Sequence, residues 1–309
     1  MYLSLKGRFG TLVIEPSLRM QAYASLGEVA LEPRLGLKWN ITDFLRFKAA
    51  GGMYSQNLIS SVDERDVVNL FNGLLSAPTN VQSEHVTQFV DQDGNSIVRQ
   101  TPNGLQYAWH AIGGFELDLF KNLSINVEGY YKHFTQLSNI NQNKTYDDIA
   151  EFSQIADVYK KDFIIESGQS YGVDFLLKYI KKRIFIWGVY SYGHSTRWDG
   201  FTEYFPVFDR RHNINLVGSY MFGKNKDLEL NIRWNLGSGL PFTPTAGFYQ
   251  SENFNGGLTT DYTTTNSSSV STLLGEFNSE RLPYYHRMDI TCLLYTSPSP
   301  RDQRGSRIP

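Results

Sequence analysis

Hydrophobic and polar residues alternate with a period of two along several long stretches of this chain. In residues 228–236, Leu228, Leu230, Ile232, Trp234 and Leu236 alternate with Glu229, Asn231, Arg233 and Asn235. The same alternation recurs over residues 34–39, 123–132, 171–179 and 211–222. Successive side chains of a β-strand point to opposite faces of its sheet. The pattern therefore predicts strands with one apolar face and one polar face.

The segments between the predicted strands alternate between very short and long. We expect ten strands, at residues 8–22, 29–39, 44–55, 106–119, 122–137, 168–180, 183–196, 210–222, 227–238 and 285–293. Tight turns are expected at 40–43, around Lys121, at 181–182 and at 223–226. Long loops are expected at 56–105, 138–167, 197–209 and 239–284, with a shorter connection at 23–28. Gathering all the tight turns at one end is typical of a membrane barrel with short periplasmic turns and long extracellular loops.

A soluble sheet packed on a core would show the same alternation, but three features favour the barrel. The strands run to roughly 11–16 residues, against about 5–6 in globular sheets. Charged Glu128, Asp174 and Arg233 stand in the middle of polar faces. Aromatic residues gather near strand ends, as in the two girdles of a membrane barrel. The sequence therefore predicts an all-β fold, a partial antiparallel transmembrane β-barrel.

Two segments depart from the simple pattern. Residues 184–190 are apolar at both odd and even positions, which face opposite sides of a strand, so we expect that strand to be buried on its inner face as well. Within the long loop 56–105, residues 85–90 and 96–100 flank an Asp93-Gly94 step, which is a strong turn signal. That loop is therefore expected to carry a hairpin of its own.

Composition narrows the function classes. The net charge of −2 gives no electrostatic footprint for nucleic acid. No apolar run approaches the roughly 18 residues of a spanning helix. The six histidines show no metal-ligand spacing, the single Cys292 allows no intrachain disulfide, and no Ser-His-Asp order with a nucleophile elbow is present. We therefore expect no enzyme activity, no catalytic residues, no metal and no cofactor.

Four segments resemble the barrel of TonB-dependent outer-membrane receptors, and they occur in the order of that family. They are residues 32–56, which include Glu32-Pro33-Arg34-Leu35, residues 208–226, which begin Phe208-Asp209-Arg210-Arg211-His212, residues 234–245, which include Gly237-Ser238-Gly239-Leu240-Pro241, and residues 281–290, which end Arg287-Met288-Asp289-Ile290. The resemblance covers nearly all of residues 8–291. It implies a barrel of about 22 strands closed by a plug domain.

The resemblance implies a function for the parent protein. Such receptors sit in the outer membrane of Gram-negative bacteria, where they bind a large scarce nutrient, such as a metal chelate, cofactor or glycan. They import it with energy supplied through TonB. The implied partners are the plug domain and remaining strands, the TonB complex acting through the plug, outer-membrane lipid, and a small-molecule or glycan substrate. No nucleic acid partner is expected.

The long loops would capture substrate. Trp198, Tyr204 and Phe205 are the candidate substrate-binding residues, because an exposed aromatic cluster can stack on a ligand. Ordinary packing within the loop is the alternative interpretation of these three side chains.

The two ends of the chain depart from the family pattern. No signal peptide or plug precedes the first strand, and only about ten strands of the expected 22 are present. Residues 293–307 resemble a tail found on unrelated predicted proteins, in which sequencing-adapter DNA has been translated. Pro298 and Pro300 would also break a strand. We therefore expect residues 1–291 to be an incomplete receptor barrel and 292–309 to be a non-native tail. A passive porin-like barrel and a secreted carbohydrate-binding β-sandwich remain the alternatives.

Overall fold

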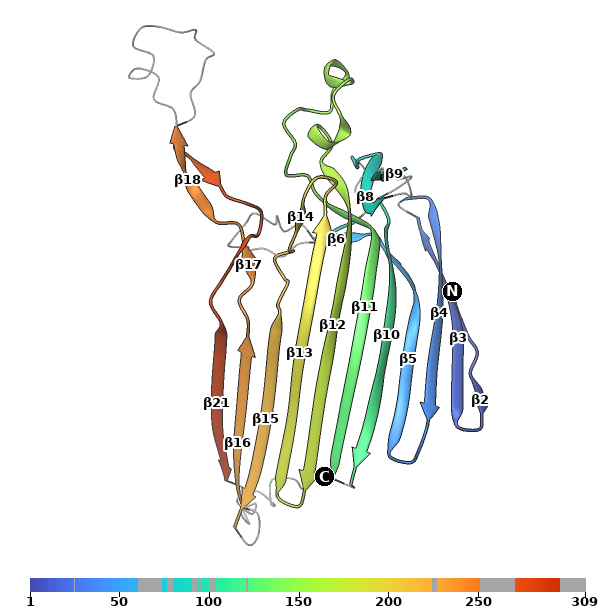
Figure 1. Cartoon of the computed structure of the whole chain (residues 1–309), viewed down its shortest axis with the longest axis vertical. Coiled ribbons are helices and arrows are strands. Elements are labelled where there is room, and N and C mark those ends of the chain that lie inside the picture. Colours follow the sequence, from blue (N-terminus) through green and yellow to red (C-terminus); the bar gives the residue numbers. More distant parts are fainter. Residues whose placement is uncertain are drawn as a thin grey trace, which may run out of the picture.

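One large antiparallel sheet dominates the molecule, a computed structural model (Figure 1). The structure describes residues 1–24, 26–60, 74–76, 80–90, 94, 96–100, 104–120, 122–223, 227–250 and 270–294. In spatial order the strands are β1 (Tyr2–Ser4), β3 (Leu12–Tyr23), β4 (Glu28–Asn40), β5 (Leu45–Gln56), β10 (Gln106–Leu119), β11 (Leu123–Ile140), β12 (Phe163–Lys181), β13 (Ile184–Trp198), β15 (His212–Phe222), β16 (Leu228–Gly237) and β21 (Tyr285–Leu294). Two short strands, β2 (Gly7–Phe9) and β14 (Glu203–Tyr204), pair with β3 and β13 and complete a 13-stranded sheet.

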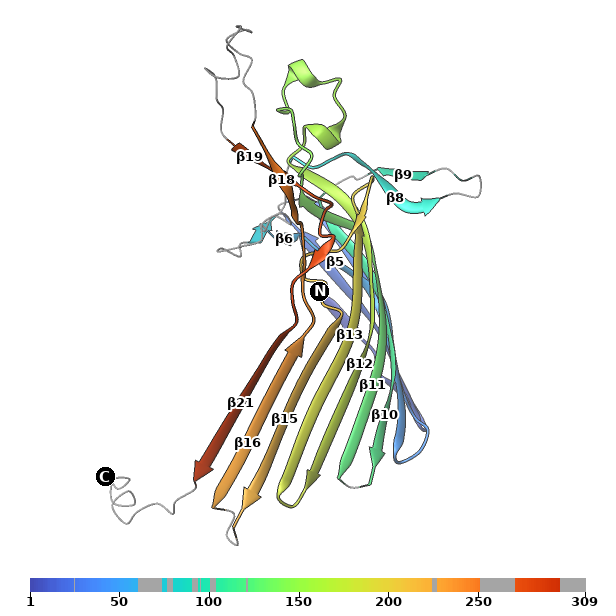
Figure 2. The ribbon, with the colours of Figure 1, turned by 60° about the vertical axis from the view of Figure 1, so that its left-hand side comes forward.

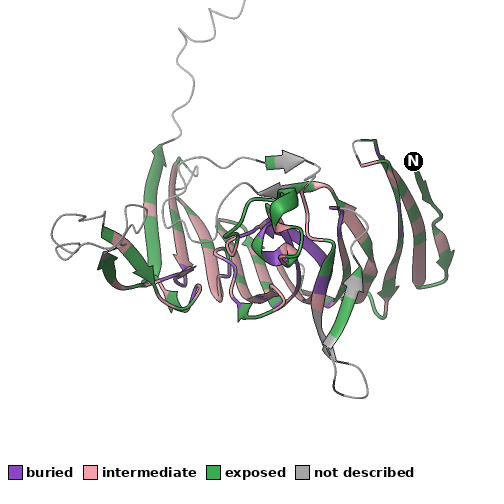
Figure 3. Ribbon diagram, turned by 90° about the horizontal axis from the view of Figure 1, so that it is seen from above, coloured by how far each residue is buried: buried purple, intermediate pink, exposed green. Residues whose placement is uncertain are grey.

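The sheet is open and curved. Figure 2 shows the strands winding from β21 round to the N-terminal strands behind, and Figure 3 shows the same curve from above. Among the described strands, β21 pairs with β16 on one side only, and no pairing joins it to β1 or β2. The predicted all-β antiparallel fold is confirmed. One continuous sheet, with no second sheet of similar size packed on it in the described part, does not fit a β-sandwich.

Short turns gather at one end of the sheet, the lower end in Figure 1, which we call the turn end. Phe120, Lys182 and Gly223 adopt positive φ values of 60°, 52° and 81° at three of these turns. Lys121 and residues 224–226 lie outside the described residues. The left-handed backbone conformation lets antiparallel strands reconnect over very few residues. The predicted placement of the tight turns is thus confirmed.

The prediction of a single first strand at 8–22 is wrong. The chain reverses at Gly10, whose φ is 62°, so that Gly7–Phe9 pairs back onto Leu12–Ile14. Between Phe9 and Leu12 only Gly10 signals the reversal, and a single glycine also occurs inside strands. With β1, this short strand covers both halves of the edge of β3.

Loops and small hairpins gather at the opposite end, which we call the loop end. The hairpins are β6 (Leu58–Ser60) with β7 (Leu74–Ser76), β8 (Glu84–Val90) with β9 (Ser96–Gln100), and β18 (Thr245–Gln250) with β19 (Val270–Leu274). A further two-stranded pair, β17 (Pro241–Phe242) with β20 (Glu280–Arg281), encloses β18 and β19. The β8–β9 pair confirms the hairpin expected in the first long loop, although residues 91–93 and 95 of its turn lie outside the described residues. Two 3-10 helices, η1 (Ala150–Phe152) and η2 (Asp157–Tyr159), lie between β11 and β12.

The predicted loop at 138–167 is shorter in the structure. β11 continues to Ile140 and β12 begins at Phe163, so that only residues 141–162 connect them. A bulge between Phe134 and Leu137 shifts the register, which hides the continuing strand from a period-two pattern. Segment 80–83 adds to the start of β12: the Gln82 amide donates to the Phe163 carbonyl, and the Phe163 amide donates to the Asn80 carbonyl. Buried positions concentrate beneath this loop (Figure 3).

The register separates the two faces of the sheet as the sequence predicts. Leu177, Gly188, Leu216, Trp234 and Met288 stand opposite one another across five strands and form one apolar row. Large apolar side chains on this face are exposed, among them Val173, Phe175, Ile232 and Ile290. A soluble protein seldom exposes so continuous an apolar surface. Among the described residues, no helix is both long and apolar enough to cross a membrane.

The opposite face carries ion pairs and long side chains laid over glycines. Arg46 pairs with Glu116 and Asp118 near the turn end. The hydroxyl of Tyr130 lies 2.6 Å from where a Cβ of Gly172 would stand and 3.2 Å from where a Cβ of Gly193 would stand. The two glycines thus make room for a ring that lies across them.

The strand that was expected to be buried on its inner face shows a mixed pattern. Ile184 and Ile186 are exposed on the apolar face, while Phe185 and Trp187 are half-buried on the other. The last strand, β21, pairs with β16 as far as Leu294, three residues beyond the boundary expected at 291. The foreign origin of 292–309 stays a prediction, and residues 295–309 lie outside the described residues.

Candidate ligand site at the loop end of the sheet

The three predicted binding residues lie at the loop end, around the connection from β13 to β15. Trp198 is the last residue of β13 and stands opposite Glu203 of β14 and Ser167 of β12. Tyr204 belongs to β14, and Phe205 follows it directly. Trp198 and Phe205 are half-buried, and Tyr204 is only 4% exposed. The cluster is therefore less exposed than direct stacking of all three rings would require, and their binding role stays a prediction.

Tyr204 is held by a buried polar network. Its hydroxyl donates to Oε1 of Glu166 at 2.7 Å and accepts from Nδ2 of Asn139 at 3.2 Å. The same amide lies 3.3 and 3.4 Å from the two Glu166 oxygens, and Arg197 pairs with Glu166 at 3.6 Å. Glu166 is 2% exposed, so its charge depends on these donors. The network fixes the ends of β11, β12, β13 and β14 in one arrangement.

A pocket of about 490 Å³ opens beside this network. It is lined by Asn139, Ile140, Gln142, Asn143, Ile164, Glu166, Asp199, Thr202, Tyr204, Glu276 and Phe277. Phe277 comes from the segment between β19 and β20, and its ring meets that of Tyr204 edge-on at 4.6 Å. The size falls within the range of roughly 300–1,000 Å³ for small-molecule sites. Segments far apart in the sequence thus converge on one polar hollow with an aromatic wall.

Phe205 takes a structural position next to the pocket. The guanidinium groups of Arg211 and Arg281 lie 4.8 and 5.3 Å from its ring centre. Both arginines pair with the buried carboxylate of Asp209, which also accepts the Ser195 amide at 2.7 Å. Asn278 donates to the Phe205 carbonyl at 2.7 Å. This cluster ties the β13–β15 connection to the β20 region, where Phe277 is carried.

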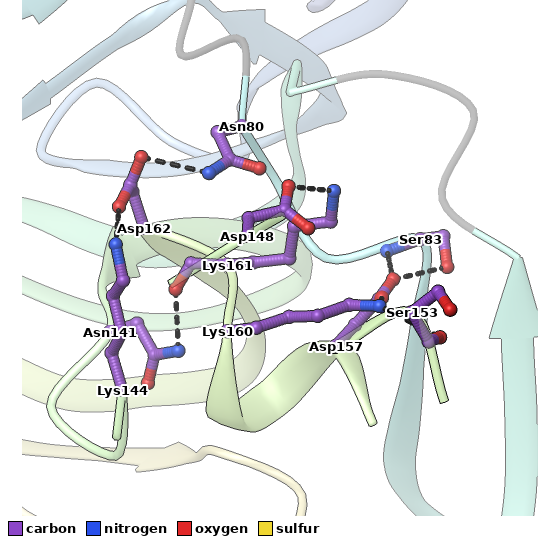
Figure 4. A network of polar contacts seen from close by, with 10 residues as sticks. All are labelled: Asn80, Ser83, Asn141, Lys144, Asp148, Ser153, Asp157, Lys160, Lys161 and Asp162. Carbon is purple, nitrogen blue, oxygen red and sulfur yellow. Dashed lines mark hydrogen bonds and ion pairs between the residues drawn. The ribbon is translucent and has the colours of Figure 1, made fainter. Parts of the chain in front are cut away.

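A second polar network joins two of the loops (Figure 4). Asp157 accepts from the Ser83 amide at 3.1 Å and from its hydroxyl at 2.7 Å. Burial pulls the pKa of Asp157 upward, but the two hydrogen bonds from Ser83 outweigh burial and leave the pKa below its usual value. Asp162 accepts from Lys144 at 2.7 Å and from Asn80 at 2.9 Å. These hydrogen bonds likewise lower the pKa of Asp162.

The network in Figure 4 fixes segment 80–83 against the loop between β11 and β12. Asn141 and Lys144, two members of this network, flank Gln142 and Asn143, which line the pocket. The first long loop therefore supports the wall of the site, although its described residues do not line the pocket.

Sequence reasoning found Tyr204 but missed Asn139, Glu166 and Phe277. Asn139 and Glu166 fall in a segment for which the pattern predicts a loop, and nothing in their local sequence distinguishes them. Glu166 can be assigned to β12 only when the bulge in β11 is known, because the bulge shifts the pairing that places Glu166 opposite Leu137. Among the described residues, no group of three or more His, Cys, Asp or Glu side chains could hold a metal ion. The arrangement of amides, carboxylates and one aromatic platform is suited to binding through hydrogen bonds and stacking.

No protein-family model and no curated protein matches the chain. Solved structures do. The chain superposes over 94% of its length on 37% of the FrpB iron transporter from Neisseria meningitidis, with a TM-score of 0.53 and 11% identity. The chain also superposes over 94% of its length on 38% of the siderophore receptor PirA from Acinetobacter baumannii, with a TM-score of 0.53 and 11% identity. For a mutant of the ferric enterobactin receptor PfeA from Pseudomonas aeruginosa, the superposition covers 96% of this chain and 37% of that protein, with a TM-score of 0.51 and 11% identity.

These similarities concern the fold, since the sequences are almost unrelated. The chain covers less than two fifths of the length of each of these proteins. It therefore has the fold of part of an outer-membrane transporter barrel, and the proteins that it resembles are transporters and receptors.

Proposed function

We propose that this chain is part of the barrel of an outer-membrane active-transport receptor in a Gram-negative bacterium. The parent protein binds a large scarce nutrient, such as a metal chelate, cofactor or glycan, and imports it with energy supplied through TonB. A plug domain and further strands complete the barrel, and the plug contacts TonB. The observation that carries the proposal is the pocket at the loop end of a sheet whose outer face is apolar and exposed.

Three further observations support transport. The face opposite the apolar one carries ion pairs between Arg46, Lys48 and Glu116 near the turn end and between Arg34 and Glu32 further along β4, as the wall of a wet lumen does. The loop end is built from hairpins that hydrogen bonds and ion pairs hold in place, which suits capture of a ligand from outside. Two of the similar structures are receptors and one is an iron transporter.

Uptake by cells tests the proposal. Cells with and without the intact receptor gene are offered labelled ferric chelates, cobalamin and oligosaccharides, and uptake is measured with the proton-motive force intact and collapsed. We expect one ligand class to enter only when the gene, TonB and the proton-motive force are all present.

Two results would contradict the proposal. Uptake that continues without TonB and without a proton-motive force indicates a passive porin. Recovery of the protein from the periplasm or medium, soluble without detergent, removes the membrane location.

A further inference from the structure

The chemical character of the loop-end pocket restricts the ligand. Three of its lining side chains are acidic, Glu166, Asp199 and Glu276. Among the described residues that line it, none is Lys, Arg or His. Arg197, which does not line the pocket, faces Glu166 at 3.6 Å. An anionic ligand would therefore meet like charge on several sides without a positive partner.

The acidic groups are not equally available. Glu166 is occupied by Tyr204, Asn139 and Arg197, and it serves to hold the wall. Oδ1 of Asp199 accepts the backbone amides of Phe201 and Thr202. Glu276 is exposed at the rim. Its carboxylate is thus placed to accept hydrogen bonds from a ligand.

The remaining lining groups combine hydrogen-bonding and apolar surfaces. Asn143 and Thr202 offer amide and hydroxyl groups, which both donate and accept. Phe277 is half-buried and stands edge-on over the buried Tyr204 ring, so that it forms the accessible aromatic wall. A sugar ring presents hydroxyls around its rim and an apolar C–H face, and these match the two kinds of surface.

We infer that this pocket is a subsite for one non-anionic sugar ring, neutral or amino, of an oligosaccharide. The inference rests on the proposed function and specifies its substrate class. The ring packs its C–H face on Phe277, and its hydroxyl or amino groups bond to Glu276, Asn143 and Thr202. Negatively charged sugars and acidic chelates are rejected by the carboxylates.

Binding to a glycan array tests the inference. The intact receptor in detergent is applied to an array of neutral, amino, uronic and sulfated oligosaccharides, and the tightest ligand is then titrated by calorimetry. We expect neutral or amino oligosaccharides to bind and their uronic counterparts to bind at least about tenfold more weakly. Binding confined to uronic or sulfated members overturns the inference, and so does the absence of binding to any glycan.

Variants locate the binding in this pocket. Phe277→Leu is expected to weaken the titrated oligosaccharide about tenfold, because the aromatic platform is lost. Glu276→Gln, at the exposed rim, retains the fold and is expected to reduce the discrimination against the uronic counterpart several-fold. Glu151→Gln in η1 removes an exposed acidic group outside the pocket and is expected to change neither value. Glu276→Gln and Phe277→Leu proteins that melt like the parent receptor and bind unchanged place the ligand elsewhere and refute the subsite.

The two proposals fail in different ways. Glycan binding measured in detergent requires neither TonB nor a proton-motive force. A receptor that binds oligosaccharides without energised uptake retains the subsite and loses the transport proposal. A receptor that imports a ferric chelate or cobalamin by TonB and binds no glycan retains transport and loses the subsite.

Discussion

Replacing Asp209 by alanine should release the loop end of the sheet. The carboxylate is 2% exposed and accepts the Ser195 amide at 2.7 Å. It pairs with Arg281 and with Arg211, whose Nε lies 3.3 Å away. Without Asp209, two guanidinium groups lose their counter-charge beside Phe205, and the Ser195 amide loses its acceptor.

The size of the expected loss of stability follows from how deeply Asp209 and its two arginine partners are buried. Removing one member of a fully buried ion pair costs about 3–5 kcal/mol. The side chains of Arg211 and Arg281 remain 19% and 29% exposed, so that water recovers part of this loss. We therefore expect a loss of about 2–3 kcal/mol in the local opening free energy. At about 1.4 kcal/mol for each factor of ten, amide exchange should accelerate roughly 30- to 150-fold.

Hydrogen exchange measured by mass spectrometry on the protein in detergent reports this change directly. Protection should fall at the Ser195 amide and at the Leu282 amide, which donates to the Leu240 carbonyl at 2.9 Å. Lys144→Gln serves as the control, because it removes a more exposed ion pair with Asp162 that is worth about 0–1 kcal/mol. Acceleration of less than about threefold at Ser195 in Asp209→Ala would refute the reasoning.

Three other perturbations probe the loops, the polar face and the apolar face. Asp157 has a lowered pKa, so its contribution is present above the unfolded pKa of about 4 and is lost as the pH falls through the folded value. The protection factor of the Ser83 amide, which is its exchange rate corrected for the intrinsic pH dependence, should therefore fall below about pH 4, and Asp157→Asn should remove most of that dependence; an unchanged protection profile contradicts the role of the carboxylate. Gly172→Val should prevent assembly, as judged by heat-modifiable mobility on gels, because its Cβ would collide with the Tyr192 carbonyl oxygen, a backbone atom that cannot move aside, and would lie 2.6 Å from the Tyr130 hydroxyl; normal assembly would contradict this close approach of the neighbouring strand. Leu216→Arg on the apolar face should lower the free energy of unfolding from lipid by about 2–4 kcal/mol, measured by urea titration; an unchanged midpoint argues against lipid contact.

The strands and turns were predictable because they depend on local patterning. Period-two alternation places Leu216 and Trp234 on one face without any knowledge of the tertiary structure. The same pattern failed at Gly10, since a single glycine is a weak turn signal, and in β11, where a bulge breaks the period.

The site was less accessible from the sequence because its contacts are long-range. Tyr204 meets Glu166 from 38 positions away, and Asp157 meets Ser83 from 74 positions away. Aromatic composition led to Tyr204, but only the fold shows that this ring is buried and that Phe277 forms the accessible wall. Such pairings depend on how the loops pack against one another, and the local sequence carries no signal of that packing.

Spin labelling along β15 in reconstituted membranes tests the central claim most directly. Single cysteines are introduced at residues 213–220 of the proposed receptor in a background without other cysteines, and collisions with oxygen and with a water-soluble nickel chelate are measured. We predict a period of two, with Leu216 and Tyr220 accessible to lipid-soluble oxygen and Asn215 and Ser219 accessible to the chelate. Uniform accessibility to the nickel chelate at every position would mean that both faces meet water, and the membrane-barrel account would be wrong.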